Sequence, residues 1–135
     1  MPTYRALPPS TSSTYKIQNL EKELRFLRQL CPTVIGSLLL SAEGLPVASD
    51  LPEPFEDEYM AARAAAMMAL GERIVGELKR GELELLLING VEGPITFVRV
   101  SDHVALAVLC QPETRIGVML LDLAYAVSQL RLLLE

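Results

Sequence analysis

The sequence contains no tryptophan and a single histidine among its 135 residues, and aromatic side chains make up only 5% of it. One histidine cannot build a histidine-rich metal site, and Cys31 and Cys110 do not have the spacing of a zinc knuckle. We therefore expect neither a bound metal nor a cofactor. Both cysteines are interpreted as buried free thiols in a reducing compartment.

Positive charge is also scarce. Lysine and arginine number 12 against 17 aspartates and glutamates, which gives a net charge of −5. The longest run of cations is the pair Lys79-Arg80. Nucleic acids and anionic membranes attract proteins through clustered cations. The charge pattern therefore predicts that neither is a partner.

No segment has the pattern of a signal peptide or of a membrane span. Residues 1–14 lack a basic start followed by an apolar core. The apolar stretch 117–127 contains Asp122 and is too short to cross a bilayer. Prolines and a Ser/Thr cluster predict a flexible tail at residues 1–14, followed by a single domain at residues 15–135. We expect a cytoplasmic protein.

The groups that catalysis needs are missing as well. No Gly-Lys-Ser/Thr string ends a phosphate-binding loop. His103 follows Asp102 in a short turn and is interpreted as an exposed turn residue rather than an oriented base. The two cysteines lie in apolar segments, where a thiol is inert. We predict no catalytic residue and expect that the protein is not an enzyme.

Aliphatic residues are what the chain has in excess. Half of its residues are hydrophobic, mostly leucine and alanine, and the mean hydropathy is +0.30. A chain of this length can build one core without a metal or a disulfide. An apolar content beyond that need predicts a second surface that is buried in an oligomer.

The spacing of apolar residues predicts an α+β fold. Periods of three and four predict helices at 15–30, 55–80 and 114–134. Short apolar runs between turns predict strands at 34–40, 45–49, 82–88, 94–100 and 104–110. The connections within each group of strands are short enough to force antiparallel neighbours. The expected domain has one five-stranded antiparallel sheet and the order α-β-β-α-β-β-β-α.

The helix at 55–80 presents three different faces. The stripe expected to face the core comprises Met60, Ala64, Met67, Gly71, Ile74, Val75 and Leu78. A second face has only small residues, which let another helix approach closely, namely Ala61, Ala65, Ala69 and Gly76. A third face mixes small, apolar and charged groups, namely Arg63, Ala66, Leu70, Arg73 and Glu77. Such a mixture is typical of a transient protein interface, although charged helix faces are more often simply solvated.

Several local strings, together with this order of elements, resemble the roadblock family, which includes dynein light-chain roadblock proteins and bacterial MglB-like gliding-motility regulators. The resemblance covers about residues 16–134. The strings that carry it are Val34-Ile35-Gly36, Glu43-Gly44-Leu45-Pro46-Val47-Ala48-Ser49, Gly81-Glu82-Leu83, Val104-Ala105-Leu106-Ala107-Val108 and Ile116-Gly117-Val118. These motifs are structural rather than catalytic.

The resemblance implies a profilin-like domain that forms homodimers. In the family, two third strands pair across the subunits and the two long helices lie side by side. The apolar strand at 82–88 agrees, because an unpaired strand of that composition would promote aggregation. The residues expected in the dimer interface are Ala61, Ala65, Ala69, Gly76, Leu83, Leu85 and Leu87.

The resemblance also implies a partner, because bacterial members act with a small Ras-like GTPase as its activating protein or as a platform. The residues expected to bind that GTPase are Arg63, Ala66, Leu70, Arg73 and Glu77. Two other functions stay open. One is a structural adaptor subunit of a scaffold or motor complex, and the other is a small-ligand sensor that uses the profilin-like sheet.

Overall fold

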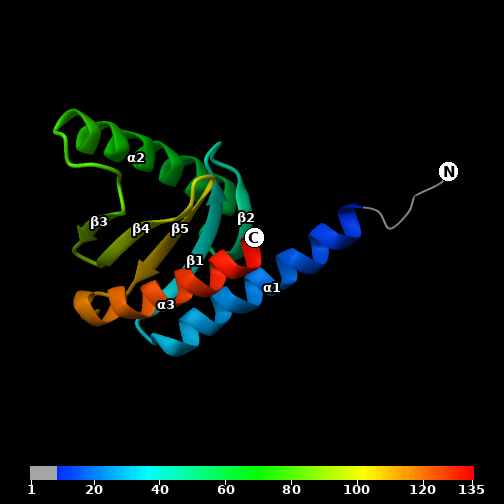
Figure 1. Ribbon diagram of the computed structural model, residues 1–135. Coiled ribbons are helices and arrows are strands. Elements are labelled where there is room, and N and C mark those ends of the chain that lie inside the picture. Colours follow the sequence, from blue (N-terminus) through cyan, green and yellow to red (C-terminus); the bar gives the residue numbers. More distant parts are fainter. Residues whose placement is uncertain (1–8) are drawn as a thin grey trace.

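The computed structural model describes the backbone of residues 9–135 and the side chains of residues 16–135 (Figure 1). Its elements are α1 (Pro9–Leu30), β1 (Val34–Ser41), β2 (Pro46–Asp50), α2 (Asp57–Glu77), β3 (Leu85–Gly90), β4 (Gly93–Ser101), β5 (Val104–Cys110) and α3 (Ile116–Leu134). The predicted α+β class and the order α-β-β-α-β-β-β-α are confirmed.

The five strands form one antiparallel sheet in the order β2-β1-β5-β4-β3. Strands β1 and β5 are neighbours in the centre, with Leu38 opposite Ala107. Strands β2 and β3 are therefore the two edges. Helices α1 and α3 lie against one face of the sheet, and α2 lies on the opposite face (Figure 1).

Alternation along the strands divides the core into two layers. On the side of α1 and α3, Leu39 and Leu106 pack with buried helix residues such as Leu24. On the side of α2, Leu38 and Phe97 pack with the buried residues of that helix, which include Ala61 and Ala64. A sheet that is covered on both faces explains why every residue of β1 and β5 is buried or half-buried.

Three element boundaries differ from the sequence-based bounds by three residues or more. Helix α1 begins at Pro9, so residues 9–14 of the expected tail are helical, while residues 1–8 lie outside the described part. Proline is well tolerated in the first turn of a helix. Helix α2 ends at Glu77 rather than residue 80, because Lys79 and Gly81 take positive φ angles of 58° and 92°. Strand β3 begins at Leu85 rather than residue 82.

The residues that α2 buries also differ from the predicted core stripe by one position at two places. Met68 is buried where Met67 was expected, and Ala61 is buried where Met60 was expected. The expected core residues Ile74 and Leu78 are instead 47% and 65% exposed. The buried side chains of α2 therefore come only from the stretch between Ala61 and Gly71.

Gly36 occupies a site in β1 that has no room for a side chain. A Cβ atom there would lie 2.5 Å from the carbonyl oxygen of Asp50 and 2.8 Å from Cδ of Pro52. Because backbone must move to relieve such a contact, Gly36→Ala is expected to lower the free energy of unfolding by about 1–3 kcal/mol. Urea denaturation measures this.

The matched control is Gly117→Ala in α3, because a Cβ at Gly117 would meet no heavy atom within 4 Å. Alanine is the better helix former, so this variant should be neutral or slightly stabilising. Equal losses in the two variants would contradict the account of Gly36.

Candidate functional site

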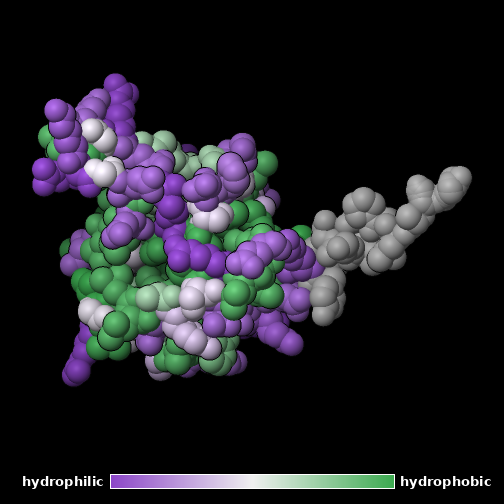
Figure 2. All heavy atoms as spheres, in the orientation of Figure 1, coloured by the Kyte–Doolittle hydropathy of each residue, from purple (hydrophilic) through white to green (hydrophobic). Residues whose placement is uncertain are grey.

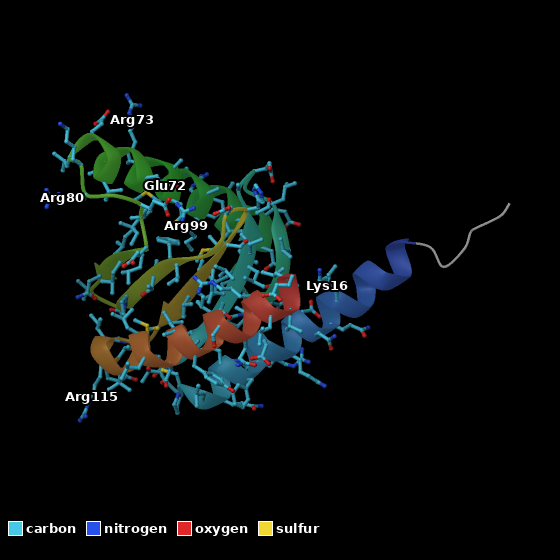
Figure 3. All side chains as sticks on the ribbon, viewed as in Figure 1. Lys16, Glu72, Arg73, Arg80, Arg99 and Arg115 are labelled. Carbon is cyan, nitrogen blue, oxygen red and sulfur yellow. The ribbon has the colours of Figure 1, made fainter. Side chains whose placement is uncertain are left out.

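The outer face of α2 is the candidate site for a protein partner. Each of the five residues predicted to bind a GTPase is exposed to solvent, and their spacing places them on one face of the helix: Arg63, Ala66, Leu70, Arg73 and Glu77. Figure 3 shows Arg73 pointing away from the sheet. The α2 helix begins with Asp57 and Glu58, which suit the positive end of its dipole, and Ser49 Oγ donates to Asp57 Oδ1 at 2.8 Å.

Two contacts order the side chains of this face. The guanidinium of Arg63 lies 4.2 Å from the ring centroid of Tyr59, which is a cation–π arrangement. Arg73 Nε lies 3.3 Å from Glu77 Oε2 in an exposed ion pair. Tyr59 is 60% exposed and was not among the predicted residues. Tyr59 lies four residues before Arg63, which places both on one face of the helix, and this spacing could have identified Tyr59 from the sequence.

Three small residues of α2, namely Ala61, Ala65 and Ala69, lie against their own chain. Ala61 is completely buried in the core, so it is removed from the predicted dimer interface. The Cβ of Ala65 lies 3.4 Å from where a Cβ on Gly44 would be, next to the β1–β2 turn. Ala65 and Ala69 also line a cavity of about 90 Å³ with the β4–β5 turn. Small side chains thus let α2 approach two turns of its own chain.

The predicted dimer residues in and before β3 also differ in whether their side chains are buried. Leu83 is buried, and a Cβ on Gly71 would lie 3.0 Å from its Cδ2. It therefore packs beneath α2 and cannot face a partner strand. Leu85 is 40% exposed and Leu87 is half-buried, both on the edge strand. Ala69 and Gly76 are also exposed, and a Cβ on Gly76 would meet nothing within 4 Å.

An apolar surface that the sequence reasoning missed lies beside the β3 edge. Ile74 and Leu78 of α2 are 47% and 65% exposed, and Ile88 of β3 is 40% exposed. Ile88 pairs with Ile95 of β4, and Leu86 and Ile95 pack against the core layer beneath α2. We call Ile74, Leu78 and Ile88 the edge patch. Figure 2 shows hydrophobic residues gathered on this side, below the hydrophilic end of α2.

Arg99 ties α2 to the sheet beside this edge. Its Nη2 donates to Glu72 Oε2 on α2, and its Nε donates to the carbonyl oxygen of Leu83 at 3.3 Å. Figure 3 shows Glu72 and Arg99 together between the helix and the sheet. The contacts hold the end of α2 and the start of β3 in one arrangement.

The described residues 16–135 contain no cluster of three or more histidine, cysteine, aspartate or glutamate side chains that could hold a metal. His103 lies exposed in the β4–β5 turn. The cavity of about 90 Å³ beneath α2 is smaller than the ~300 Å³ of ordinary ligand pockets, so this cavity by itself does not favour a small-ligand sensor.

Cys31 and Cys110 are both buried free thiols, and burial raises the pKa of Cys110 from 9.0 to about 11, with a smaller contribution from the charge of Cys31. The protonated thiol is favoured in the folded state. Its contribution to stability is therefore complete below pH 9 and is lost as the pH rises through 11. We expect native Cys110 to react far more slowly than an unfolded thiol with a disulfide reagent at a pH of about 8.

Labelling of Cys31→Ser, which leaves Cys110 as the only thiol, measures that rate, and the same variant in urea provides the unfolded reference. Equal labelling rates in the two conditions would contradict the assignment of an inert buried thiol.

Among the described residues, α3 is the one helix long and apolar enough to cross a membrane by length and composition. That is weak evidence, because a core helix passes the same test. Helix α3 buries Met119, Leu123 and Leu130 among other residues, and packs on the sheet beside α1.

Comparison with known proteins identifies the family. A model of the Roadblock/LC7 domain matches residues 20–110. Two uncharacterized proteins of Methanocaldococcus jannaschii are each 28% identical to the chain over 96 residues, which is 71% of this chain and 83% of theirs.

Solved structures agree with this result. A Roadblock/LC7 domain from Streptomyces avermitilis superimposes with a TM-score of 0.79 at 23% identity, covering 84% of this chain and 96% of that one. MglB of Myxococcus xanthus gives 0.79 at 16% identity, covering 85% and 86%. The gliding protein MglB of Thermus thermophilus gives 0.79 at 15% identity, covering 87% and 90%. The fold is thus the roadblock fold, and the chain belongs to the Roadblock/LC7 domain family.

Proposed function

We propose that two copies of this chain form a homodimer that binds a small Ras-like GTPase and regulates or positions it without an active site of its own. The observation that carries the proposal is the outer face of α2. There, Arg63 and Arg73 lie with the exposed side chains of Tyr59 and Leu70 on one face of a rigid helix. Tyrosine and arginine are among the residues most enriched in binding hot spots.

Membership of the roadblock family supports this partner, because the resemblance to MglB-like regulators implies action with a small GTPase. The partner's own residues would carry out hydrolysis, and the dimer would position them. Arg63 and Arg73 sit on a regular helix rather than on a loop that could project either one into a nucleotide site. We therefore assign neither as a catalytic finger. The cytoplasm is the location we propose, with no part for nucleic acid or membrane.

Dimerisation is supported by two features of the β3 side. Strand β3 is a sheet edge that reads Leu-Leu-Leu-Ile, and an edge of this kind is an aggregation hazard unless another chain covers it. The edge patch of Ile74, Leu78 and Ile88 lies on the same side. We propose that β3 pairs with β3 of a second copy and that the edge patch becomes buried. Leu85 and Leu87 remain in the proposed interface.

A twofold dimer presents two copies of the α2 outer face. If the two faces lie close to the axis, one GTPase covers both, which gives two chains for one GTPase. The test is a titration of the small GTPase purified with this protein from its native cell. It is loaded with a non-hydrolysable GTP analogue in one series and with GDP in another. Saturable binding supports the proposal, and an absence of binding in both nucleotide states contradicts it.

A structural adaptor role is the second candidate, and one observation favours it. The outer side of α1 and α3 carries exposed apolar residues away from α2. Leu121 is 73% exposed, and the rings of Phe26 and Tyr125 pair at 6.3 Å. A second docking surface would suit a subunit that joins two partners. An adaptor would bind its partners without changing the rate of nucleotide hydrolysis or exchange, and both rates are measurable with the same GTPase.

A further inference from the structure

A groove of about 890 Å³ opens at the sheet edge where β3 begins. Its floor is apolar and is formed by Val98 of β4 with Leu120, Leu123 and Val127 of α3. The segment that leads into β3 forms the opposite wall, from Arg80 to Leu85. The groove is therefore continuous with the strand edge that we propose as the dimer interface.

The rim of the groove carries two arginines without a carboxylate partner. Arg80 Nε donates to the carbonyl oxygen of Leu78 at 3.2 Å, and Arg131 Nε donates to that of Val100 at 2.6 Å. Within the described residues, neither guanidinium forms an ion pair with a carboxylate, whereas Arg99 is paired with Glu72. Glu82 and Glu84 also line the groove. Figure 3 shows Arg80 on the outer side of this segment, pointing away from the body.

The β3–β4 hairpin ends in a tip that matches this groove in chemistry. The tip is Val91-Glu92, and Val91 is 94% exposed, the largest exposure among the large hydrophobic residues described. Gly93 follows the tip, and glycine is required there because its φ is 125° and a Cβ would collide with the carbonyl oxygen of Cys110. The tip therefore presents an apolar side chain and a carboxylate at one end of β3. The groove at the other end of β3 has an apolar floor and arginines that form no ion pair among the described residues.

We propose that each hairpin tip docks into the groove of the other subunit, an inference that rests on the homodimer of the proposed function. A twofold axis perpendicular to the sheet makes the two β3 strands antiparallel. With the axis at Leu87, the two copies of Leu87 lie opposite each other and Leu85 lies opposite Asn89 of the partner subunit, so that paired residues point to the same face of the sheet. Val91 and Glu92 of the partner subunit then continue alongside Leu83 and Glu82, which line the groove.

In this arrangement Val91 of the partner subunit lies on the α3 side of the sheet and covers the apolar floor, and the partner's Glu92 lies on the α2 side and pairs with Arg80. The contact occurs twice in the dimer, once at each end of the paired strands. It fixes the register of β3 against β3, which strand pairing alone leaves open to slippage. The tip and the groove together therefore determine which residues of the two subunits face each other.

Charge exchange tests the contact. Glu92→Arg alone, and Arg80→Glu alone, should each raise the dimer dissociation constant about tenfold, because each places like charges together. The double variant restores opposite charges in both copies of the contact, so its dissociation constant should return to within about threefold of the unmodified protein. Sedimentation equilibrium gives the constants, and thermal unfolding verifies that each variant folds.

Disulfide trapping gives an independent readout. Val91→Cys combined with Ala124→Cys places one thiol at the tip and one in the groove wall, and oxidation should link the two subunits covalently. Val91→Cys with Leu121→Cys is the control, because Leu121 is 73% exposed and does not line the groove. If the two cysteine pairs form cross-links equally well, this inference is wrong. It is also wrong if the effects of the two charge changes simply add in a protein that stays dimeric. In either case the proposed homodimer is not contradicted. A monomeric unmodified protein overturns the proposed homodimer as well.

Discussion

Ile74→Glu is expected to convert the protein from a dimer to a monomer at micromolar concentration. Ile74 is 47% exposed within one chain and belongs to the edge patch, which the proposed dimer buries. A carboxylate placed there would lose its hydration without gaining a partner. The cost is about 3 kcal/mol or more, which corresponds to a rise in the dissociation constant of at least about a hundredfold. Light scattering with size-exclusion chromatography measures the change in mass.

Ala69→Glu is the matched control, because it adds the same carboxylate to the opposite flank of the same helix. Ala69 lines the cavity beside the β4–β5 turn of its own chain. The variant should remain dimeric. If Ala69→Glu dissociates the dimer and Ile74→Glu does not, the two helices meet along the small residues, and the assignment of the edge patch is wrong.

The double variant Leu70→Glu, Arg73→Glu should lose binding to the GTPase while the protein remains dimeric. Leu70 is 51% exposed at the centre of the outer face, and Arg73 is exposed one turn further along α2. Loss of one apolar and one arginine anchor, together with two new negative charges, should weaken binding by about a hundredfold or more. Isothermal titration with the GTPase bound to a non-hydrolysable analogue measures the affinity.

The control for this loss is Leu121→Glu, Arg115→Glu on α3, which changes the same residue types on the other side of the sheet. Figure 3 shows Arg115 on the α3 layer, far from α2. This variant should bind the GTPase like the unmodified protein. Equal affinities for both double variants would show that the GTPase docks elsewhere.

The sequence predicted the order and type of the elements, and the antiparallel pairing within each group of strands, because those properties depend on local patterns. Strand β5 was located to the residue, from Val104 to Cys110, since its apolar run ends at a turn on one side and at Gln111-Pro112 on the other. The start of β3 was misplaced because Leu83 continues the same apolar alternation. The choice between strand and core for Leu83 depends on its contact with Gly71, which is a tertiary property.

The candidate site was predicted only in part. The outer face of α2 was identified correctly as exposed, because residues three and four apart necessarily share a helix face. The small face was interpreted correctly only in part, because periodicity does not show what a small residue approaches. Ala65 approaches Gly44 of the β1–β2 turn, and Ala61 lies in the core. For the same reason Ile74 was assigned to the core, although α2 buries no side chain beyond Gly71.

The mass of the complex with the GTPase tests the central claim most directly. The unmodified protein is mixed with an excess of the GTPase bound to a non-hydrolysable analogue, and the mass of the complex is measured by multi-angle light scattering. The account predicts a complex that contains two 14.8 kDa chains and one GTPase. A complex of one chain with one GTPase, or no complex at any ratio, would contradict it.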